Sequence, residues 1–285
     1  MNMAEFFKIL SQSLTTPDCI LSFAGLVLLG LWALRNRWGT RALRWSRPRK
    51  NYLSAYIVFA PFLGWIIAVF IASGLIQDYT KNLPEQAKAL ANNITMGIIE
   101  ILIIIFMLTI ANQYFTKKLS GLGFKSKSIG KDTKWSTVNL LAIWPVLVAT
   151  ILLSTHIGRM FYGPDYQLQQ HEELKLLMED PCAALITSVI LLTIVIAPVF
   201  EEIMFRGLIQ TLFRTHLRYP WPAIILTSVL FAIIHDNISH WPTLFTLAIC
   251  LGYSYEKSGS LFRPIIIHMF FNAISVISTL LTASQ

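Results

Sequence analysis

The sequence predicts an all-α protein: a polytopic transmembrane bundle of about eight spans, with both termini on the outer side of the membrane. Of its 285 residues, 55% are hydrophobic and only 13% are charged, whereas a soluble domain carries about 25% charged residues. Long apolar runs recur along the whole chain, and the loops between them alternate between rich and poor in lysine and arginine. Together these observations indicate an integral multi-pass membrane protein.

The predicted spans follow the apolar runs in order. A helix needs about 20 apolar residues to cross the hydrocarbon core of a bilayer. The sixth and seventh runs, with about 15 to 17 residues, lie at or below the short limit of that length. The eight predicted spans are residues 18–34, 52–76, 94–115, 136–156, 181–205, 219–235, 241–255 and 262–282.

Charge in the connecting segments predicts the orientation. Residues 35–50 contain seven basic side chains and no acid, and residues 116–134 contain six lysines and one aspartate. Residues 77–93 and 157–180, by contrast, hold at least as many acids as bases. Basic loops face the cytoplasm, and such loops explain the net charge of +8. The charge therefore does not indicate a nucleic-acid surface, and no nucleic-acid partner is expected.

The chain has neither a cysteine framework nor a clear cleavable leader. Cys19, Cys182 and Cys250 are dispersed in or beside apolar runs, which argues against both disulfides and a cysteine metal site. Lys8 alone is a poor basic n-region, so we expect the first span to remain as an anchor.

Polar residues divide the chain into two parts. Up to about residue 180 the spans hold almost no charge. Glu100 is the exception: it is either a second polar contact inside the bundle or a residue near the outer surface, and we favour the outer surface. From residue 181 onward, polar groups recur inside apolar helices. The sequence therefore predicts supporting transmembrane helices in 1–180 and a catalytic core in 181–285.

The first polar cluster follows the apolar run that ends at Phe200. Ionisable groups inside a membrane cost roughly 3 kcal/mol or more and mark functional sites. Glu202 and Arg206 are four residues apart with the acid first, which favours an ion pair, and Glu201 projects about 100° away as a free carboxylate. Pro198 is expected to kink the helix and release a backbone carbonyl near the site. The alternative is that all three charges lie at the cytoplasmic end of the helix.

Two further clusters lie on later spans. His235 follows Phe231 by one helical turn, and His268 precedes Asn272 by one turn. Each has a structural alternative, since a lone histidine often only packs and a histidine–amide pair can bridge helices in lipid. A carboxylate and a histidine can also polarise a water while His268 and Asn272 hold a developing oxyanion. That chemistry is amide hydrolysis without a covalent enzyme intermediate.

Three motifs occur in order on successive apolar segments and resemble those of the CPBP family, the CAAX proteases and bacteriocin-processing enzymes, which includes the type II CAAX prenyl endopeptidases. The resemblance covers about residues 181–285 and implies an eight-helix intramembrane protease. The motifs are E-E-x-x-x-R (Glu201, Glu202, Arg206), F-x-x-x-H (Phe231, His235) and H-x-x-x-N (His268, Asn272).

The resemblance also implies roles for these residues. Glu201 and His235 would activate water, and His268 with Asn272 would form the oxyanion site. Glu202, Arg206 and Phe231 would support them. The substrate implied is a membrane-associated or lipidated peptide, and the location is a prokaryotic cytoplasmic membrane.

Metal use and two other functions stay open. Family members have been described both as metalloproteases and as metal-independent glutamate proteases. No metal is assigned from the sequence. If zinc is bound, its ligands would be Glu201, His235 and His268, with one position open. The alternatives are a non-enzymatic binding or immunity protein, and a proton-coupled transporter with Glu201 and His235 as a relay.

Overall fold

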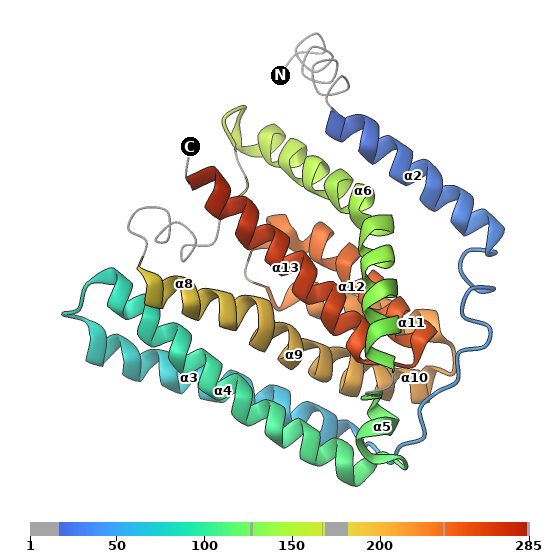
Figure 1. The fold of residues 1–285 in the computed structure, drawn as a ribbon, viewed down its shortest axis with the longest axis horizontal. Helices are drawn as coiled ribbons and strands as arrows, with labels where there is room; N and C mark the ends of the chain where they lie inside the picture. Colours follow the sequence, from blue (N-terminus) through green and yellow to red (C-terminus); the bar gives the residue numbers. More distant parts are fainter. Residues whose placement is uncertain (1–16, 126–127, 167, 169–181, 236, 284–285) are drawn as a thin grey trace.

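The computed structural model describes residues 17–125, 128–166, 168, 182–235 and 237–283, and this part of the chain is helical almost throughout (Figure 1). The only β pairing within it is an isolated bridge between Asn51 and Phe115. The α-helices are α2 (Pro17–Arg35), α3 (Ala55–Thr80), α4 (Glu85–Tyr114), α5 (Lys118–Leu122), α6 (Ile129–Tyr162), α8 (Ala183–Val189), α9 (Ala197–Glu202), α10 (Thr211–Leu217), α11 (Pro220–Ile233), α12 (Trp241–Ser258) and α13 (Phe262–Ala283). Two π-helical segments, η2 (Ile190–Ile196) and η3 (Ile203–Gln210), and one 3-10 turn, η4 (Ile238–His240), complete the set.

A helix corresponds to each of the eight predicted spans, but several bounds differ. Helix α4 begins at Glu85 and not at residue 94, because polar residues extend it beyond the apolar run. The fifth span runs on to Leu217 and not to residue 205, since α8, η2, α9, η3 and α10 form one continuous helix, which we call the central rod (Ala183–Leu217).

Length and composition support membrane crossing for part of this set. Among the residues that the structure describes, four helices are long and apolar enough to cross a membrane: α3, α4, α6 and the central rod. The regions Cys19–Arg35, Pro220–Ile233 and Phe262–Ser278 are shorter apolar helices. Eight crossings and the outer location of both termini remain predictions. The predicted boundary at residue 180 also remains one, because residues 169–181 lie outside the described residues.

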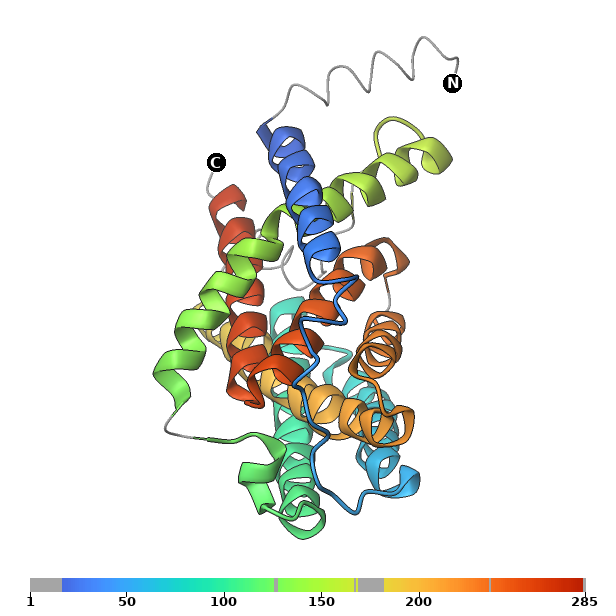
Figure 2. The same cartoon turned by 90° about the vertical axis from the view of Figure 1, so that its right-hand side faces the viewer.

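The central rod lies between two groups of helices (Figures 1 and 2). Helices α3 and α4 cover one side of it, and α11, α12 and α13 pack on the other. All eight residues of η3 are buried, and the largest apolar cluster includes Phe200, Phe205 and Phe231. Any charged group on this part of the rod is therefore enclosed by the bundle.

Proline shapes the middle of the rod. Pro198 has no N–H, and its ring would clash with the carbonyl four residues earlier in a regular α-helix. The seven-residue π-helix η2 stands immediately before α9, and its wider turns accommodate the ring. The Ala197 N–H donates to Leu192 O, five residues back. The structure thus accommodates Pro198 through widened turns.

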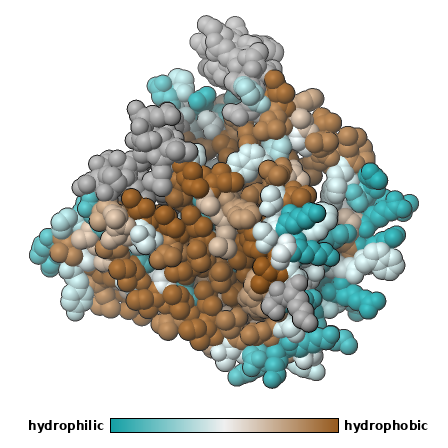
Figure 3. Space-filling view, in the orientation of Figure 1, coloured by the Kyte–Doolittle hydropathy of each residue, from teal (hydrophilic) through white to brown (hydrophobic). Residues whose placement is uncertain are grey.

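The outer surface is apolar over most of the view in Figure 3, with hydrophilic residues gathered toward its edges. Outward-facing side chains of α3 and α4, such as Phe70 and Leu102, are largely exposed. A continuous exposed apolar surface of this kind suits a lipid environment and not water.

Candidate active site

The central rod buries the first polar cluster. Glu202 and Arg206 are both fully buried, and the predicted ion pair is present: Arg206 Nη1 donates to Glu202 Oε1 at 2.8 Å. Arg206 Nη2 donates to the carbonyl of Ala248 on α12 at 3.2 Å. Because the rod continues to Leu217, the alternative that these charges lie at a helix end is wrong.

Phe231 on α11 is the common neighbour of the charged groups. The guanidinium carbon of Arg206 lies 4.6 Å from the centroid of its ring, a cation–π distance. The ring centroids of His235 and His268 lie 4.9 Å and 5.8 Å from that of Phe231. The structure therefore brings the three motifs together around one aromatic side chain.

His268 on α13 lies between the two glutamates. Its Nδ1 is 3.0 Å from Glu202 Oε1, and because an ionised carboxylate only accepts, Nδ1 carries the hydrogen and donates. Its Nε2 faces Glu201 Oε2 across 3.8 Å, which is longer than a hydrogen bond. Glu202 thus orients the imidazole toward Glu201.

Glu201 is the free carboxylate that the sequence predicts. Its side chain is 18% exposed, whereas that of Glu202 is fully enclosed. The buried Glu201 Oε2 has no hydrogen-bond partner. An unpaired carboxylate oxygen within an apolar bundle is costly, which is typical of a functional group.

Asn272 makes a contact with the central rod. Its Nδ2 donates to the carbonyl of Thr193 in η2 at 2.8 Å, which engages one of the two amide hydrogens. In a π-helix the carbonyl of Thr193 would accept from the N–H of residue 198, and Pro198 has none. Pro198 therefore does release a carbonyl near the site, as predicted, and Asn272 satisfies it.

His235 follows the end of α11 and is half-buried. Its Nδ1 is 2.7 Å from the carbonyl of Phe231; since a carbonyl only accepts, Nδ1 donates and Nε2 is left as the acceptor of the neutral ring. The Trp241 Nε1 donates to the His235 carbonyl at 2.9 Å. His235 is linked to the cluster by the contact between its ring and that of Phe231, and not by a hydrogen bond to Glu201 or Glu202.

Comparison with known proteins identifies the region that carries this geometry. Residues 183–274 match the family model described as type II CAAX prenyl endopeptidase Rce1-like, a range that includes every predicted site residue. This stretch is similar to an Rce1-like domain. The resemblance to the CAAX protease family is therefore confirmed, and the four apolar helices agree with an integral membrane protein.

One curated relative matches part of the chain. An uncharacterized 24.3 kDa protein of Escherichia coli is 26% identical over 129 residues, which cover 44% of this chain and 59% of that protein. The chain thus spans about 59% of the length of the curated relative. No solved structure matches it.

A third acid, Glu100, faces the Rce1-like domain, which the sequence did not predict. Glu100 on α4 is only 6% exposed, and α4 packs against α9, the segment of the rod that carries Glu201. The expectation that it lies near the outer surface is wrong. A signal was present: Asn93, Gly97 and Glu100 recur at helical spacing, and a Cβ on Gly97 would lie 3.6 Å from Ile196 of the rod.

A zinc ion would need a set of protein ligands close to one another. Within the described residues there is no group of three or more His, Cys, Asp or Glu side chains that could hold a metal ion. His268 Nδ1 donates to Glu202 and His235 Nδ1 to a backbone carbonyl, which leaves Nε2 of each ring as the nitrogen that could bind a metal. In the described part of the chain, however, Glu201, His235 and His268 are not grouped as the ligands of one metal ion.

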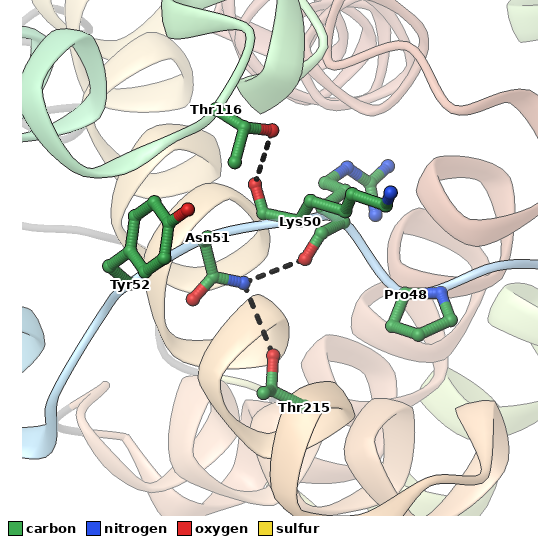
Figure 4. A pocket seen from close by; sticks show the side chains of 7 residues that line it. Pro48, Lys50, Asn51, Tyr52, Thr116 and Thr215 are labelled. Atoms are coloured by element: carbon green, nitrogen blue, oxygen red, sulfur yellow. Dashed lines mark hydrogen bonds between the residues drawn. The ribbon is translucent and has the colours of Figure 1, made fainter.

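A surface pocket of about 350 Å³ lies away from this site (Figure 4). Its wall joins the linker before α3 to the end of the rod, since Asn51 Nδ2 donates to Thr215 Oγ1 at 3.2 Å. The pocket is lined by Pro48, Arg49, Lys50, Asn51, Tyr52, Thr116 and Thr215. None of the predicted site residues lines this pocket, so it is separate from the candidate active site.

Proposed function

We propose that this chain is an intramembrane endopeptidase that hydrolyses a peptide bond of a membrane-associated or lipidated peptide. One observation carries the proposal: the unpaired Oε2 of Glu201 faces His268 Nε2 across 3.8 Å inside an apolar bundle. A base and an imidazole held at that separation, in a domain of the Rce1-like family, suit attack by water on a carbonyl.

Glu201 acts as the general base, together with His235. The carboxylate and the free Nε2 of His235 both accept, so one water can donate a hydrogen to each. As the water oxygen bonds to the substrate carbonyl carbon, Glu201 takes its proton. When the C–N bond breaks, Glu201 returns that proton to the leaving nitrogen.

His268 and Asn272 hold the oxyanion. To serve this role, His268 must carry a hydrogen on both ring nitrogens, because the Glu202 carboxylate and the oxyanion both only accept. Glu202 fixes its Nδ1–H, which leaves Nε2–H to donate near Glu201. The amide nitrogen of Asn272 has two hydrogens; Thr193 O takes one, and the second remains for the oxyanion.

The first prediction concerns Glu201→Gln, which keeps the size of the side chain and removes the base. Because positioned acid–base groups contribute about 10²–10⁴-fold, we expect the cleavage rate to fall by that factor while the protein still accumulates and folds. The measurement is membrane proteomics of cells that carry the wild type or the variant, where uncleaved substrates accumulate in the variant.

The matched control is Glu85→Gln, the same change at an exposed glutamate that pairs with Lys88, and it should leave cleavage intact. Identical cleavage products with Glu201→Gln would remove Glu201 from the mechanism. A binding or immunity protein would keep its partner with Glu201→Gln, and a transporter would show substrate-dependent proton flux in liposomes.

A further inference from the structure

A polar groove lies between α3 and α4, the pair that covers one side of the central rod. Its volume is about 620 Å³, and hydrophilic side chains line much of it, among them Ser73, Gln77, Asn92 and Thr95. Lys81 and Lys88, near the turn that joins the two helices, also line it. The lining also includes apolar side chains such as Val69 and Ile76, but its polar groups can hold water, whereas wholly apolar cavities stay dry.

Helical spacing extends both walls of the groove toward the interior. On α4, Asn92 and Met96 line the groove, and Glu100 lies one turn beyond Met96 on the same face. On α3, Ala72 and Val69 line it, and the same stripe, continued by one turn, reaches Trp65.

Three buried polar atoms lie where these stripes approach the rod, and none has a hydrogen-bond partner: Trp65 Nε1, Glu100 Oε2 and Glu201 Oε2. The rings of Trp65 and Phe200 pack with centroids 5.5 Å apart, and Phe200 directly precedes Glu201. Helix α4, which carries Glu100, packs against both α3 and α9, and α9 carries Glu201. One donor and two acceptors are thus left unsatisfied on helices that pack together, although buried polar groups are nearly always hydrogen-bonded, often by ordered water.

We propose that the groove between α3 and α4 is a water-entry path that passes Trp65 and Glu100 and ends at Glu201. The path itself rests on the groove and the three unpaired atoms; its purpose rests on the proposed function, because each hydrolysis consumes one water inside an apolar bundle. Glu100 is a positioning residue, which holds water beside Glu201 without touching the substrate.

The second prediction tests the path without an activity assay. In a background that lacks the native cysteines, Met96→Cys places a thiol at the inner end of the groove. Leu102→Cys, 60% exposed on the outer surface of the same helix, is the matched control facing lipid. With a charged, water-soluble maleimide on protein in liposomes, we expect labelling at position 96 at least ~10-fold faster, since thiols react as thiolates in water. Equal rates would overturn the path, as would protection of position 96 by lipid.

Activity then separates the path from the mechanism. Glu100→Leu should lower kcat at least ~10-fold with KM unchanged, and Glu100→Gln, which still binds water, should recover most of the rate. A rise in KM alone, or equal losses in both variants, would contradict the role of Glu100. Fast labelling of Met96→Cys together with full activity of Glu201→Gln would support the path and reject the protease mechanism. Slow labelling of Met96→Cys together with loss of activity in Glu201→Gln would reject the path and support the mechanism.

Discussion

Among single residues, Arg206 holds the candidate site together. Its guanidinium is fully buried and contacts three helices: it pairs with Glu202 on its own rod, donates to Ala248 on α12 and stacks over Phe231 on α11. Glu202 in turn orients His268 from α13. The orientation of His268 therefore depends on Arg206, which acts on it through Glu202.

The third prediction follows from this burial. Arg206→Met leaves the Glu202 carboxylate enclosed without its cation, and breaking a buried pair costs about 3–5 kcal/mol. We expect a clearly lower midpoint of thermal unfolding in detergent micelles. Lys88→Met, which breaks the exposed pair with Glu85, should change the midpoint little. Equal midpoints for Arg206→Met and the wild type would show that the pair does not stabilise the fold.

Between helices, small residues set how closely the supporting part packs. Within α2, a Cβ on Gly25 would lie 2.3 Å from Pro145 Cβ of α6, whereas a Cβ on Gly30 would meet nothing within 4 Å. Small residues at helix crossings are typical of membrane bundles, because they let backbones approach. Gly25 is therefore a point of close approach between α2 and α6, and Gly30 is not.

The fourth prediction uses this pair within one helix. Gly25→Ala should push α2 away from α6 and increase hydrogen exchange of its backbone amides. Gly30→Ala should leave exchange unchanged or lower, because alanine favours helix over glycine by about 1 kcal/mol. Equal exchange in the two variants would show that α2 does not depend on this contact.

Across the whole molecule, Glu256 on α12 ties distant segments together at the end of the rod. It forms salt bridges with Arg49 of the linker before α3 at 3.7 Å and with Arg214 of α10 at 3.8 Å. Ser46 Oγ of the same linker also donates to it, and Gln210 Nε2 of η3 donates at 3.3 Å. One buried carboxylate thus joins the linker to the core that carries the site.

The fifth prediction tests this junction. Glu256→Gln removes the charge shared by the buried Arg214 and the partly buried Arg49. The linker should therefore detach, and trypsin should cut it, at Arg44 or Arg49, faster than in the wild type. Unfolding should also begin at a lower temperature, because uncompensated buried charge is costly. Glu85→Gln serves again as the surface control. An unchanged digestion pattern would mean that other contacts, such as Lys257 Nζ donating to Ala42 O, hold the linker alone.

Local patterns were sufficient for much of this architecture. Composition and apolar length predicted a membrane bundle of helices, and a spacing of four predicted the Glu202–Arg206 pair. The missing N–H of Pro198 predicted a free carbonyl, which is that of Thr193. These features depend on hydrophobicity or on geometry within one helix, both of which can be read from neighbouring residues.

Only the tertiary structure decided how the helices face one another. His268 meets Glu202 across 66 residues of chain, and Asn272 meets Thr193 across 79. Glu100 is buried inside the bundle and does not lie at the outer surface. The period of a helix shows which of its residues share a face, but the rotation of each helix against its neighbours is set by packing between segments far apart in the sequence.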